Sequence, residues 1–154
     1  KEIVEFLGSL LAGTVPQEVV DEARHQLRVA DEFESISDYL VSILKLDLKR
    51  RSTDVEIADQ DMELLLALHA KVAEYIEMIR TAFREQNTDI LSKAVSHGKS
   101  ITHLMKDARQ AHLDRVTRQH VSPLCCLIYI DMLSSYRKIK DHGLNIAEAI
   151  AGEK

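Results

Sequence analysis

The chain has 154 residues, of which 45% are hydrophobic and 29% are charged, with five glycines, two prolines and no tryptophan. This length suits one domain with a full core, and the scarcity of glycine and proline favours an all-α protein. The formal net charge of −5 disfavours a broad nucleic-acid-binding surface, because such surfaces are strongly basic.

Apolar periodicity predicts a short first helix over 2–12 and four long helices over 16–51, 58–86, 89–119 and 123–151. With a rise of about 1.5 Å per residue, the first long helix should span about 54 Å. The expected architecture is therefore an elongated antiparallel four-helix bundle. The last helix is apolar around much of its circumference and is expected to be the most buried. Because the chain starts without Met inside an amphipathic segment, we interpret 1–13 as the tail of a preceding helix in a longer membrane protein.

The helix predicted over 16–51 carries the densest acidic cluster of the chain. Asp31, Glu34 and Asp38 are spaced so that an α-helix places them within an arc of about 60°. Glu34 is expected within the apolar stripe of this helix, whose predicted members are Val20, Ala23, Leu27, Ala30, Phe33, Leu40, Val41, Leu44 and Leu48. A carboxylate turned toward a core requires a cation or hydrogen-bond donors opposite it.

Part of this pattern returns near the end of the chain. Ile36 and Asp38 align with Ile139 and Asp141 at an offset of 103 residues, and the match continues in the same helical phase. The sequence therefore contains one weak internal repeat. Gly143 lies within the second copy, where a glycine in mid-helix indicates the close approach of another helix.

These two segments resemble the PhoU domain. Glu34-x-x-x-Asp38 matches the acidic E/D-x-x-x-D motif of that family, and the sequence DHGLNIAE at 141–148 is similar to its second signature. Arg137 stands where the second motif would have its first acid. The spacing over 23–44 is most similar to the PhoU region at the C-terminus of Na/phosphate cotransporter family proteins.

The resemblance implies spectrin-repeat-like three-helix repeats, here the last helix of one repeat followed by a complete second repeat. It also implies a non-enzymatic regulatory domain of a sodium-dependent phosphate transporter, which controls phosphate uptake at the cytoplasmic face of the inner membrane. The expected partner is the transmembrane transporter portion of the same chain, with a homodimer also considered and no nucleic acid expected.

Two interpretations of the acidic residues remain open. In the first, a Mg, Mn, Fe or Zn ion is bound by oxygen ligands, as in some PhoU proteins, and the candidate ligands are Glu34, Asp38, Asp141, Asp31 and Asn145. In the second, Arg137 pairs with Glu34 or Asp38 and no metal binds. The second interpretation suits a free-standing helical adaptor or phosphate-signalling regulator whose acids form interhelical salt bridges with Arg137, Lys138 and Lys140.

Catalytic chemistry is disfavoured by the motifs present. Glu22-x-x-His25 is half of a di-iron bundle motif, but no other histidine has a glutamate three residues before it. No catalytic residues are predicted. The adjacent Cys125 and Cys126 are expected to be reduced and to pack in an apolar run, and His97, His103 and His112 are expected at solvated or edge positions.

Overall fold

The structure is a computed structural model that describes residues 2–12 and 16–152. Every regular element in these ranges is a helix: α1 (Glu2–Leu11), α2 (Gln17–Ser52), α3 (Asp59–Glu85), α4 (Ile90–Arg118) and α5 (Pro123–Ile150). The prediction of an all-α bundle is confirmed. No helix in the described ranges has both the length and the apolar character needed to span a bilayer.

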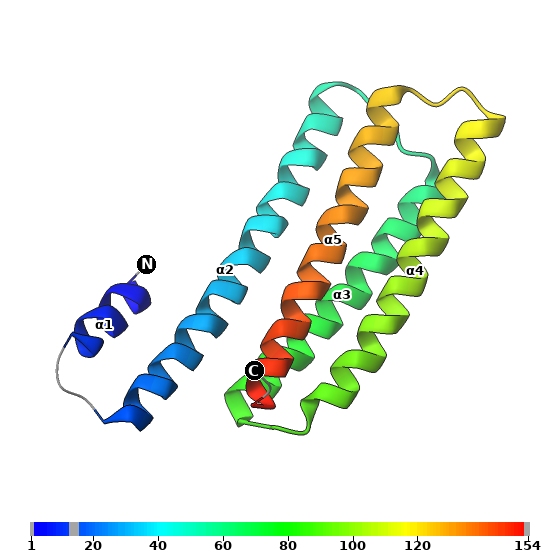
Figure 1. Cartoon of the computed structure of the whole chain (residues 1–154). Coiled ribbons are helices and arrows are strands. Elements are labelled where there is room, and N and C mark those ends of the chain that lie inside the picture. Colours follow the sequence, from blue (N-terminus) through cyan, green and yellow to red (C-terminus); the bar gives the residue numbers. More distant parts are fainter. Residues whose placement is uncertain (1, 13–15, 153–154) are drawn as a thin grey trace.

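Helix α5 lies at the centre of the bundle. It runs between α2 on one side and the α3–α4 pair on the other, with successive long helices antiparallel (Figure 1). Helix α2 packs along α5, whereas α1 packs on the first half of α2. The expectation that the last helix is the most buried is confirmed, because α5 contributes more buried residues than any other helix.

The inward face of α2 differs from the predicted stripe. Val29 and Ile36 are buried, and Ile43, seven residues further on, packs against the core. The predicted stripe is wrong in the second half of α2, where its four apolar members are exposed: Leu40, Val41, Leu44 and Leu48. A seven-residue spacing keeps one face of α2 against α5 over its length, so these four residues lie on another face.

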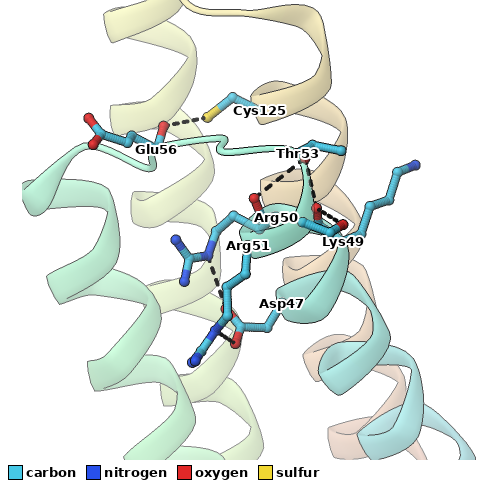
Figure 2. A network of polar contacts seen from close by, with 8 residues as sticks. Asp47, Lys49, Arg50, Arg51, Thr53, Glu56 and Cys125 are labelled. Atoms are coloured by element: carbon cyan, nitrogen blue, oxygen red, sulfur yellow. Dashed lines mark hydrogen bonds and ion pairs between the residues drawn. The ribbon is translucent and has the colours of Figure 1, made fainter.

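Local polar contacts mark the end of α2 and the start of α5. At the end of α2, Arg50 and Arg51 donate to Asp47 over 3.0 and 2.7 Å (Figure 2). Burial alone would raise the pKa of Asp47, but the hydrogen bonds from both arginines outweigh it and lower this pKa. The backbone N–H of Cys125 donates to the Ser122 side chain over 3.1 Å, which caps α5, and Pro123 occupies the first position of the helix.

The segment that links α2 to α3 is held against the start of α5. The thiol of Cys125 donates to the backbone carbonyl of Glu56 over 3.4 Å (Figure 2). Cys125 is a free, buried cysteine, and its burial, followed by the proximity of Cys126, raises the pKa of its thiol. Packing of this cysteine in an apolar environment is as predicted.

Candidate functional site

Helix α2 makes a polar contact with α5 through Glu32, which lies within the acidic segment of α2. His142 Nδ1 lies 2.6 Å from Glu32 Oε2, and the side-chain amide of Asn145 donates to both carboxylate oxygens over 3.1 Å. The Glu32 side chain is only 18% exposed. A mostly buried carboxylate with these two polar partners is well satisfied, so this cluster fixes how α2 is positioned on α5.

An aromatic contact orients the histidine of this cluster. Tyr39 lies on α2 about two turns after Glu32, and its ring stacks on that of His142 with a centroid separation of 5.6 Å. Both His142 and Asn145 belong to the segment 141–148, which the sequence analysis compares with the second PhoU signature. The structure therefore brings the two similar segments together, although through Glu32 and not through the predicted acids.

A large cavity opens beside this contact. It has a volume of about 820 Å³ and lies between the first half of α2 and the ends of α3 and α5. Asp31 and Glu34 line it, and Phe33 and Phe83 meet across it in an edge-to-face contact with centroids 6.1 Å apart. The lining thus combines apolar side chains with the carboxylates of α2 and the guanidinium of Arg84.

The predicted acids of α2 do not face the core. Asp31, Glu34 and Asp38 are all exposed, so the expectation that Glu34 lies within the buried stripe is wrong. The inward carboxylate is Glu32, which is three residues after Val29 and four before Ile36, and so has the helical phase of the buried face. That phase is the sequence signal by which Glu32 could have been found.

The candidate residues on α5 have other partners. The side chain of Asp141 is 47% exposed and pairs with the ammonium group of Lys140 over 2.5 Å. Asn145 is engaged with Glu32. Arg137 is exposed, and no ion pair within residues 2–12 and 16–152 joins it to Glu34 or Asp38.

These positions do not form a preformed metal centre. Over the part of the chain that the structure describes, no three His, Cys, Asp or Glu side chains are gathered closely enough to hold a metal ion. Glu34 and Asp38 remain one turn apart on a solvated surface, where any cation would take most of its ligands from water.

A second buried polar cluster was missed by the sequence analysis. Asp61 and His112 are each 1% exposed, and His112 Nδ1 lies 2.8 Å from Asp61 Oδ2. Arg115 donates to both oxygens of Asp61 over 3.1 Å. The prediction of a solvated or edge position for His112 is wrong, because this carboxylate compensates its burial within the α3–α4 interface.

Tyr129 of α5 completes this cluster. Its ring stacks on His112 with centroids 4.4 Å apart, and its hydroxyl donates to the backbone carbonyl of Asp61 over 3.2 Å. Burial, and next the negative charge of Asp61, raise the pKa of the Tyr129 hydroxyl. The cluster joins α3, α4 and α5, and since it is almost closed to solvent we interpret it as structural.

No protein-family model, no curated protein and no solved structure matches this chain. Its function is therefore inferred from its own geometry and from the two segments that resemble PhoU.

Proposed function

We propose that this chain is a PhoU-like regulatory domain that controls phosphate uptake by a sodium-dependent phosphate transporter. The observation that carries the proposal is the contact of α2 with α5 through Glu32, His142 and Asn145. It places the two segments that resemble the family against each other, as repeat-ending helices are expected to lie. In this proposal the domain acts at the cytoplasmic face of the membrane, on the transmembrane portion of its own chain, and is not an enzyme.

The packing of α2 supports a regulatory role. This helix contacts the rest of the bundle mainly through α5, and the cavity of about 820 Å³ separates part of its first half from α3. Its outer face exposes an apolar stripe made of Leu40, Val41, Leu44 and Leu48. Exposed apolar patches of this kind are typical of surfaces that contact other proteins or membrane proteins. A helix that packs mainly on α5 and exposes an apolar face is suited to transmit a change between the two.

The alternative is a free-standing helical adaptor in which the acids serve only as salt bridges. The pairing of Asp141 with Lys140 favours this alternative, because Asp141, a candidate metal ligand, already has a cationic partner. However, Lys140 and Asp141 are neighbours on one helix, so their pair does not join helices. The interhelical polar contact is made by Glu32, which accepts hydrogen bonds from an amide and approaches an imidazole.

The first test measures phosphate uptake by the full-length protein in cells grown over a range of phosphate supply. We expect deletion of this domain, and the substitution Glu32→Gln, to change how uptake responds to supply, because both disturb the α2–α5 contact. Glu18→Gln is the matched control, since Glu18 is an exposed acid at the start of the same helix. Unchanged uptake at every phosphate concentration after deletion would refute the proposal.

The proposal includes only a weak cation site at Glu34 and Asp38, completed by water. We expect titration of the purified domain with Mn²⁺ to give a dissociation constant on the order of 10⁻⁴–10⁻³ M, the range of weak Ca²⁺ sites, because water would supply most of the ligands. Glu34→Gln combined with Asp38→Asn should abolish this binding, whereas Glu2→Gln combined with Glu5→Gln should not. Mn²⁺ affinity that is equal in both double variants would remove the metal from the proposal and leave the α2–α5 contact as its basis.

A further inference from the structure

A second cavity lies on the opposite side of α5, where α3, α4 and α5 meet. Its volume is about 490 Å³, within the range of pockets that hold small organic ligands. Its polar lining residues are Tyr75, Lys99, Thr102, His103, Lys106 and Lys140. No carboxylate is among the residues that line it. In a chain of net charge −5, this is a local concentration of positive charge.

The cationic groups converge from two helices. Lys99, His103 and Lys106 are spaced by four and three residues, so they occupy one face of α4. Lys140 comes from α5 and lies against Gly98. A Cβ atom at Gly98 would be 3.6 Å from Lys140 Cδ. Lys140 also pairs with Asp141, which is not among the lining residues, so one of the three ammonium groups is already partly compensated. Lys99 and Lys106 are exposed and have no such carboxylate partner among the described residues.

The floor of the cavity contains a buried hydroxyl without a partner. Tyr75 is 0% exposed, and its hydroxyl makes no hydrogen bond to the described part of the chain. This oxygen lies 3.9 Å from the position that a Cβ atom would occupy at Gly98, and Gly98 itself lines the cavity. Burial, followed by the charges of Asp141 and Glu148, raises the pKa of Tyr75, so the hydroxyl keeps its proton and is a donor in need of an acceptor.

We propose that this cavity binds a phosphorylated small molecule. Lys99, Lys106 and Lys140 line a space in which two or more negative charges would be compensated, and Tyr75 offers a hydroxyl donor there. A phosphoryl group has both the charge and the acceptor oxygens for these partners. Val95 and Leu144 form an apolar wall, which provides contact area for an organic body attached to the phosphate. This site is separate from the α2–α5 contact and does not rest on the proposed function.

Calorimetric titration of the whole domain with phenyl phosphate and, separately, with inorganic phosphate tests this assignment. We expect both anions to bind, with the ester at least tenfold tighter because of the apolar wall. Lys99→Gln combined with Lys106→Gln should weaken both by tenfold or more, and Tyr75→Phe should weaken both by a few-fold. The matched control combines Lys93→Gln with Arg109→Gln, which removes the same charge from exposed positions of α4 outside the cavity and should leave binding unchanged.

Three results would overturn the assignment or part of it. The assignment would be overturned if neither phenyl phosphate nor inorganic phosphate bound at millimolar concentration. It would also be overturned if the Lys99 and Lys106 substitutions left both affinities unchanged. Equal affinities for the ester and for inorganic phosphate would overturn the proposal that the ligand has an organic body, and would identify free phosphate as the occupant. Far-UV circular dichroism and thermal melting of each variant confirm that loss of binding is not loss of fold.

Discussion

Replacement of Asp61 by alanine is expected to lower the free energy of unfolding by about 3–5 kcal/mol. Asp61 is buried and is the acceptor for Arg115, and its carboxylate also faces the ring of His112. Without the carboxylate, the buried imidazole and the half-buried guanidinium would lose their shared partner. Removal of one member from such a group is strongly destabilising, because the others cannot regain solvent. Urea denaturation followed by circular dichroism measures the change.

Asp59→Ala is the matched control for this prediction. Asp59 is an exposed acid in the first turn of the same helix, and its loss should cost only about 0.3–1 kcal/mol through the helix dipole. Asp61→Asn should fall between the two, because the amide keeps one acceptor oxygen but loses the charge. A loss below about 1 kcal/mol for Asp61→Ala would show that solvent reaches this cluster and that it is not a closed structural network.

The helical architecture could be predicted because its signals are local. Periodic apolar residues predict long helices, and the Ser122–Pro123 pair predicts where α5 begins, since the serine side chain accepts a hydrogen bond from the backbone N–H three residues later. The facing of α2 could not be predicted as reliably. This helix carries apolar residues on two faces, and the inward face follows Val29, Ile36 and Ile43 and not Leu44 or Leu48. Only its packing on α5 distinguishes the two faces.

The error in the phase of α2 explains the error in the site. Because the predicted apolar stripe lies on the wrong face of α2, Glu34 is expected to face the core. In the structure Glu34 is exposed, and Glu32 is the carboxylate that faces α5. The partners of Glu32 lie 110 and 113 residues later in the chain, and Asp61 and His112 are separated by 51 residues. No spacing within one helix reveals such pairs, because they depend on which helices become neighbours and in which register.

The close approach at Gly143 gives the second large prediction. A Cβ atom at this position would lie 2.7 Å from Tyr75 Cε1 and about as close, at 3.0 and 3.1 Å, to the ends of Ile76 and Ile79. Alanine gains about 1 kcal/mol in helix propensity over glycine. The buried ring of Tyr75 cannot move away without disturbing the core, so overpacking of about 1–3 kcal/mol should outweigh that gain. We expect Gly143→Ala to destabilise the fold by up to about 2 kcal/mol and Gly143→Val by more.

Gly98 provides the control, because it also lies within a helix but has space around it. A Cβ atom there would meet only the flexible Lys140 chain at 3.6 Å and the Tyr75 hydroxyl at 3.9 Å, which are ordinary contacts. Gly98→Ala should therefore stabilise the protein by about 0.5–1 kcal/mol. Thermal and urea unfolding of the two alanine variants should give shifts of opposite sign. If Gly143→Ala were as stabilising as Gly98→Ala, α3 and α5 would have to lie further apart at this point, and Tyr75 would no longer be held at the floor of the basic cavity.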